Sequence, residues 1–157
     1  MFKLILVFAL LSKMFSAAVP TPEIAAEVVP NFSSSVLPNF AAPITERGPG
    51  HRGVDIPDAA AVASPFSGSV SFVGKVYNRN LITITSDRLR ASFEPVCTNL
   101  RAGQVVSAGQ EVAQYCPGDE GYEQHCEKCV HLSVRTSRGY LNPLLFYGQL
   151  NPSRIVG

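Results

Sequence analysis

The chain has 157 residues, 46% of them hydrophobic, which suffices for one domain core of about 100 residues with extensions. Its net charge of +1 gives no indication of the basic surface that nucleic-acid binding requires, so we expect no nucleic-acid partner. Twelve glycines, twelve prolines and no tryptophan indicate many turns, so short β-strands are favoured over long helices.

The first 18 residues have the pattern of a secretory signal peptide. Lys3 precedes an apolar run at 4–11, and residues 16–18 are the small residues that a signal peptidase reads. A transmembrane helix needs about 20 apolar residues, so we expect cleavage near Ala18 rather than an anchor extended to Phe15. The mature chain would then be secreted or held in the cell envelope, without a stable membrane span. It would lose two of its 13 basic residues and carry 11 against 12 acidic ones.

Residues 19–39 are rich in proline and serine and are expected to form an extended linker. One candidate edge strand lies at 36–40. Asn31 begins an N-glycosylation acceptor sequence, which has meaning only in a eukaryotic host.

The stretch 50–56 contains His51 and Asp55, four positions apart around Gly53. On a straight strand these two side chains would start roughly 13 Å apart, so a shared metal ion requires a bend, which Gly53 can supply. With His131 they would make two imidazoles and one carboxylate, a set that suits zinc with a fourth position left for water. The alternative is that His51 and Asp55 form an ordinary surface pair on a loop.

The body of the chain alternates short apolar runs with turn residues at a spacing of about ten residues, which is typical of an antiparallel β-sandwich or barrel. The expected strands are 61–63, 69–73, 81–85 and 89–93. We expect no helix of three turns. Residues 100–112 contain two Gly-Gln turns flanked by valines, as in lipoyl and biotinyl carrier modules, but the segment has no lysine, so it is interpreted as a structural hairpin.

Four cysteines, Cys97, Cys116, Cys126 and Cys129, would form two disulfides in an exported chain, with three possible pairings. We favour Cys97 with Cys116 and Cys126 with Cys129. Two alternatives remain. Because Cys129 and His131 share a strand face, Cys129 could act near the metal as a thiolate, or residues 125–131 could form a small structural zinc site.

Together these features resemble the core of the lysostaphin and LytM-type zinc endopeptidases. The resemblance covers roughly Phe40 to Gly148 and is carried by the order of its motifs: 51–55, Pro65-Phe66-Ser67-Gly68-Ser69-Val70, the valine-glycine segment, Val130-His131-Leu132 and Tyr140-Leu141-Asn142-Pro143-Leu144. It implies an all-β antiparallel fold, a barrel-sandwich hybrid. It also implies a secreted or envelope location and peptidoglycan cross-link peptides as substrate. The chain would divide into a signal peptide at 1–18, a linker at 19–39, a peptidase-like domain at 40–148 and a tail at 149–157.

The resemblance also assigns site residues. The family's three zinc ligands match His51, Asp55 and His131. Two further histidines of the family orient the attacking water and stabilise the oxyanion. Their positions are occupied here by Pro95, within Phe93-Glu94-Pro95-Val96, and by Cys129.

Glu94 and Cys129 are therefore the candidate catalytic groups, because Pro95 offers no donor. On a regular strand Glu94 would face away from the site that position 95 faces. Losing both histidines could cost about 10⁴-fold in rate. Two functions follow: a zinc peptidase of the cell wall with weak or altered hydrolysis, or a non-catalytic wall-binding or regulatory protein on the same scaffold.

Overall fold

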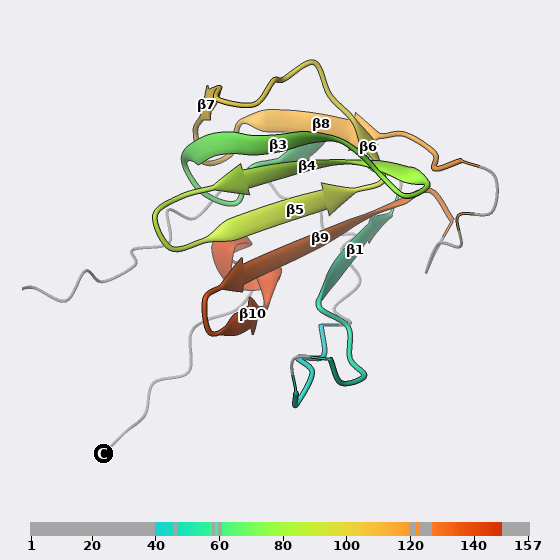
Figure 1. Cartoon of the computed structure of the whole chain (residues 1–157). Coiled ribbons are helices and arrows are strands. Elements are labelled where there is room, and N and C mark those ends of the chain that lie inside the picture. Colours follow the sequence, from blue (N-terminus) through green and yellow to red (C-terminus); the bar gives the residue numbers. More distant parts are fainter. Residues whose placement is uncertain are drawn as a thin grey trace, which may run out of the picture.

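The computed structural model describes residues 40–45, 47–57, 59, 61–119, 122 and 127–148. Within these ranges the chain is antiparallel β-structure with one 3₁₀ helix and no α-helix, which confirms the predicted all-β fold (Figure 1). No helix in this part of the chain has the length and apolar character to cross a bilayer. The expected signal peptide, linker and tail lie outside the described residues, as does the edge strand at 36–40 except for Phe40.

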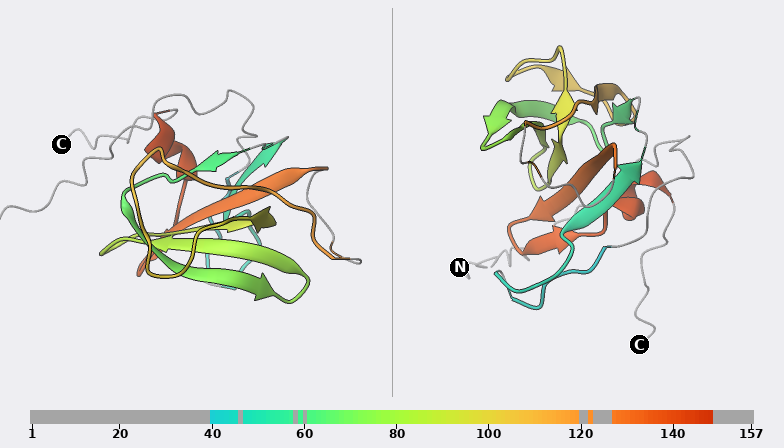
Figure 2. Two further views of the ribbon diagram at one scale, coloured as in Figure 1. Left: turned by 90° about the horizontal axis from the view of Figure 1, so that it is seen from above. Right: turned by 90° about the vertical axis from the view of Figure 1, so that its right-hand side faces the viewer.

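The main sheet has the strand order β1-β9-β5-β4-β3-β7, and β10 also pairs with β9. All of its pairings are antiparallel. Figures 1 and 2 show its strong twist between β3 and β1. Its strands are β1 Gly53–Pro57, β3 Gly68–Val76, β4 Arg79–Thr85, β5 Arg90–Glu94, β7 Val105–Val106, β9 Cys129–Thr136 and β10 Gly139–Leu141.

A smaller sheet, with the order β2-β8-β6, completes the β-structure. Its strands are β2 Val62–Ala63, β6 Val96–Cys97 and β8 Glu111–Tyr115. The 3₁₀ helix η1, Pro143–Tyr147, begins after Asn142, whose side chain accepts a hydrogen bond from the Leu144 amide at 3.1 Å. Near the end of η1 the Tyr147 hydroxyl donates to the Ala63 carbonyl at 2.8 Å and so ties the helix to β2.

One face of the main sheet supplies the core. Alternate residues of β1, β4, β5 and β9 are fully buried there: Val54, Ile82, Ile84, Ala91, Phe93, Val130, Leu132 and Val134. Val62, Val96 and Val112 of the small sheet, with Leu144 and Phe146 of η1, belong to the same cluster. Because strand side chains alternate between faces, the intervening residues of these strands point to the opposite face, which we call the site face.

The strands expected at 69–73, 81–85 and 89–93 correspond to β3, β4 and β5. The hairpin predicted for 100–112 is wrong. Its two turns are present, with Gly103 and Gly109 at positive φ, but β7 pairs with β3 in the main sheet whereas β8 pairs with β2 and β6. β7 thus forms an edge of the main sheet and β8 the central strand of the small sheet, an assignment that local turn residues do not encode.

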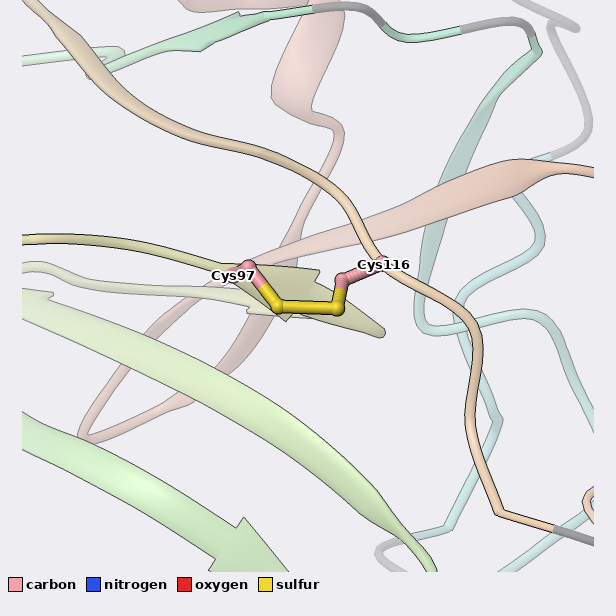
Figure 3. Close-up of a disulfide and its surroundings, with 2 residues drawn as sticks. All are labelled: Cys97 and Cys116. Carbon is pink, nitrogen blue, oxygen red and sulfur yellow. A yellow bond between two sulfur atoms is a disulfide. The ribbon is translucent and has the colours of Figure 1, made fainter.

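The predicted disulfide between Cys97 and Cys116 is present (Figure 3). It joins β6 to the residue that follows β8, two segments that are already paired in the small sheet. The second predicted pair includes Cys126, which lies outside the described residues. Cys129 is itself disulfide-bonded.

Candidate metal centre

Three neighbouring strands bring polar side chains together on the site face. In the register of the main sheet His131 of β9 lies opposite Asp55 of β1 on one side and opposite Glu94 of β5 on the other. Residues directly opposite each other in an antiparallel pair project to the same face. The three side chains therefore form one row across the sheet.

His51 joins this row from outside the strand. A short bridge to Ala41 holds its backbone: the His51 amide donates to the Ala41 carbonyl at 2.8 Å and the Ala41 amide donates to the His51 carbonyl at 3.0 Å. Strand β1 begins only at Gly53. The chain does turn between His51 and Asp55, since His51 Nε2 lies 3.5 Å from Asp55 Oδ2.

Gly53 serves a different purpose from the predicted one. It is a regular member of β1, opposite Ser133. A Cβ atom built there would lie 2.7 Å from His131 Nε2 and 2.1 Å from the Leu132 carbonyl oxygen. The missing side chain therefore makes room for the His131 ring and the neighbouring strand, whereas the turn lies before Gly53.

The Asp55 carboxylate, 2% exposed, lies between the two imidazoles. Its Oδ1 is 3.0 Å from His131 Nδ1, and the centroids of the two histidine rings are 4.9 Å apart. One potential ligand atom from each residue lies within 4.8 Å of the others. Two atoms bound to one zinc ion at about 2.1 Å are at most about 4.2 Å apart, so small side-chain movements would bring all three donors onto one ion. The donor set fits zinc in chemistry and in geometry.

Glu94 is held beside His131 by Arg79 of β4. Arg79 Nε lies 3.0 Å from Glu94 Oε2, and Arg79 Nη2 donates to Glu94 Oε1 at 3.1 Å. The hydrogen bond to Glu94 raises the pKa of Arg79. Since Glu94 lies opposite His131, the expectation that it faces away from the site is wrong. Pro95 instead lies between β5 and β6, where the chain passes from one sheet to the other.

Sequence reasoning missed Tyr122. The Arg79 guanidinium lies over its ring, 5.3 Å from the centroid. Burial raises the pKa of Tyr122, and the negative charges of Glu94 and Asp55 raise it further. A phenol thus lies near the carboxylates of the site, and its position in a loop without a recognisable motif gave no signal for it.

Cys129 opens β9 on the same face as His131 and is 5% exposed. Because its sulfur is in a disulfide, it is neither a thiolate ligand nor a nucleophile in this state. The catalytic role predicted for Cys129 stays a prediction and applies to the reduced protein. For the alternative structural zinc site, His125 and Cys126 lie outside the described residues.

Comparison with known proteins gives one distant set of sequence relatives. No family model matches the chain. Uncharacterized proteins of Mycobacterium tuberculosis and Mycobacterium bovis are 31% identical to it over 103 residues, which is 61% of this chain. The matched part spans about 41% of the length of these relatives.

Solved structures share the fold. The chain superposes on LytU with a TM-score of 0.59 at 18% identity, over 76% of this chain and 88% of that one. The catalytic domain of the prophage-encoded M23 protein EnpA from Enterococcus faecalis gives 0.55 at 21% identity, over 73% and 94%. A zinc-containing peptidase from Vibrio cholerae gives 0.52 at 23% identity, over 73% and 36%. The chain therefore has the fold of the LytM-type peptidases.

Proposed function

We propose that this chain is a secreted or envelope-located zinc peptidase that acts on peptide cross-links of bacterial peptidoglycan. The observation that carries the proposal is the buried Asp55 carboxylate between His51 and His131, on the site face of a fold shared with M23 peptidases. These three residues would hold the ion. As part of the same proposal, residues 1–18 are removed on export, 19–39 form a tether and 149–157 form a tail.

A zinc ion in this position would supply a water of pKa near 7 and polarise the carbonyl of the bound amide. The residues of the chain divide the remaining tasks. Asp55 contacts both imidazoles and fixes their orientation. Glu94, paired with Arg79 and opposite His131, would accept the proton of the attacking water. A positioned base of this kind contributes typically about 10²- to 10⁴-fold in rate.

Zinc content per chain tests the proposal. The purified protein should hold about one zinc, and His131→Ala should hold none, because the tripod loses a ligand. Ser133→Ala, on the same strand and face, is the matched control and should keep its zinc. Wild type should release peptide fragments from peptidoglycan, and chelation should stop the release. Absence of zinc from wild type, or release that chelation leaves unchanged, would contradict the proposal.

A second candidate is a non-catalytic protein that binds wall peptides or regulates a partner enzyme. It is favoured by Pro95 and the disulfide-bonded Cys129, which replace the two further histidines of the resembling family and provide no acid-base group. This candidate expects sedimentation with peptidoglycan that persists after chelation, without fragment release. Zinc-dependent release of fragments would rule it out.

A further inference from the structure

The site face continues beyond the metal-binding row in two further rows. The next row contains Ser133 of β9, Ser92 of β5 and Thr83 of β4, in direct register. The Thr83 and Ser92 hydroxyls are hydrogen-bonded at 3.0 Å. These are neutral groups: Thr83 is buried, whereas Ser92 and Ser133 are partly exposed and can hydrogen-bond to a peptide backbone that passes over them.

The third row places two arginines face to face. Arg135 of β9 lies directly opposite Arg90 of β5, and both are exposed. Neither forms an ion pair with any residue that the structure describes, whereas Arg79 on the same face is neutralised by Glu94. Like charges directly opposite each other destabilise a sheet, so folding alone gives no reason for this pair.

A third guanidinium, that of Arg52, lies over the residue opposite Arg135. Tyr140 of β10 lies opposite Arg135, and the Arg52 guanidinium lies over the Tyr140 ring, 5.8 Å from its centroid. Arg52 also donates to the Gly48 carbonyl at 2.9 Å, which fixes its orientation. We call Arg52, Arg90 and Arg135 the arginine strip. Arg52 directly follows His51 in the chain, whereas Arg90 and Arg135 are separated from the metal-binding row by the hydroxyl row.

We propose that the arginine strip binds a carboxylate of the peptide whose amide lies at the metal centre. The inference rests on the proposed function, and names the substrate class as a peptide with a free carboxylate on one side of the reacting bond. Guanidinium groups bind carboxylates through paired, charge-assisted hydrogen bonds. A ligand carboxylate would also relieve the repulsion between Arg90 and Arg135.

The register sets the length of that peptide. Arg135 lies four residues beyond His131 on β9, a distance of about 13 Å along the strand. An extended peptide covers this distance in about four residues. The intervening hydroxyl row carries no charge, and the chain as a whole has a net charge of only +1. Among the three rows of the site face, positive charge that no carboxylate neutralises lies only in the third row, which suits a single carboxylate.

Binding of one peptide in two forms tests the strip. The probe is N-acetylated tetra-alanine ending either in a carboxylate or in a carboxamide, titrated into the purified protein by calorimetry. Wild type should bind the carboxylate form about tenfold more tightly, and the double variant Arg90→Gln/Arg135→Gln should bind the two forms equally. Arg135→Lys, which keeps the charge but loses the paired hydrogen bonds, should retain part of the preference. Arg101→Gln, an exposed arginine in the loop before β7, should retain all of it.

Equal binding of the two peptides by wild type, including no binding of either, would overturn the inference, as would a preference that survives in the double variant. The thermal unfolding of each variant is measured alongside, so that lost folding is not mistaken for lost recognition. His131→Ala separates the two proposals. If the protein binds no zinc but still prefers the carboxylate peptide, the arginine strip is a ligand site independent of the proposed zinc peptidase function. If fragments are released without any preference, the strip alone is refuted.

Discussion

Asp55 is the residue on which the candidate metal centre depends. It is one of three polar or charged residues described as buried, and each of its oxygens is directed at a different histidine. A buried carboxylate without such partners would be strongly unfavourable. The two histidines beside the carboxylate supply this compensation. The predicted roles of His51, Asp55 and His131 as ligands stay predictions, and the structure supports them by bringing the three side chains together.

Gly53→Ala tests whether the absence of a side chain at position 53 makes room for the His131 ring. The new methyl group would meet the His131 ring and the backbone of β9, so we expect loss of zinc affinity and a destabilisation of about 1–3 kcal/mol, as for an overpacked site. Zinc titration and thermal unfolding measure the two effects. Gly74→Ala on β3 is the matched control, because the nearest atom there is the tip of the half-exposed Phe72 ring, at 3.1 Å. Unchanged zinc affinity in Gly53→Ala would contradict this account of the glycine.

At the scale of elements, β9 performs two tasks at once. Val130, Leu132 and Val134 fill the core, while Cys129, His131, Ser133 and Arg135 present the chemistry of the site face. The same alternation in β1 and β5 gives Val54 and Phe93 to the core and Asp55 and Glu94 to the site. The burial that stabilises the sheet thereby also fixes the direction of the polar side chains.

Tyr147 in the helix η1 makes the folding stability of the protein depend on pH in the alkaline range. Burial raises the pKa of Tyr147 far above its ordinary value near 10. The unfolded chain therefore loses this proton above about pH 10 while the folded chain keeps it. The contribution of Tyr147 to the free energy of unfolding is complete below that pH. Above it, the free energy of unfolding should fall by up to about 1.4 kcal/mol per pH unit.

Tyr147→Phe is the variant that isolates this contribution. It should lower the free energy of unfolding at neutral pH by about 1–3 kcal/mol, because the Ala63 carbonyl loses its hydrogen-bond donor. It should also flatten the decline above pH 10. Urea unfolding of both proteins at pH 8 and at pH 10.5 gives the comparison. The exposed Tyr77→Phe is the control and should leave the slope unchanged.

At the scale of the whole molecule, two sheets and one 3₁₀ helix enclose a single core, and the small sheet contributes short strands of two to five residues. Strands this short form few backbone hydrogen bonds with each other, so other interactions must stabilise the small sheet. The Cys97–Cys116 disulfide provides such an interaction by closing a loop with a sequence separation of 19. The disulfide stabilises chiefly by restricting the unfolded chain.

Replacing both cysteines, Cys97→Ser with Cys116→Ser, should therefore cost about 2–4 kcal/mol of unfolding free energy. Zinc binding should persist, because His51, Asp55 and His131 lie outside the small sheet. Denaturant unfolding and zinc content of the double variant are the two measurements. If zinc were lost while the protein remained folded, the small sheet would have to be regarded as part of the site.

Much of this protein was determined by its sequence alone. Apolar alternation and turn residues predicted β3, β4 and β5, because burial of one strand face is a local pattern with a period of two residues. The cysteine count in a chain expected to be exported indicated disulfides; the predicted Cys97–Cys116 bond is present, and Cys129 is also disulfide-bonded. His51, Asp55 and His131 could be grouped as one candidate set through the family resemblance.

Only the tertiary structure decided the rest, because strand pairing depends on contacts between residues far apart in the chain. In the tertiary structure Glu94 lies opposite His131 and pairs with Arg79. Strand alternation alone had predicted that Glu94 faces away from the site. The tertiary structure also assigned β7 and β8 to different sheets. The pairing of Arg90 with Arg135, and the position of Tyr122 against Arg79, follow from register and loop packing, which no local pattern of side chains records.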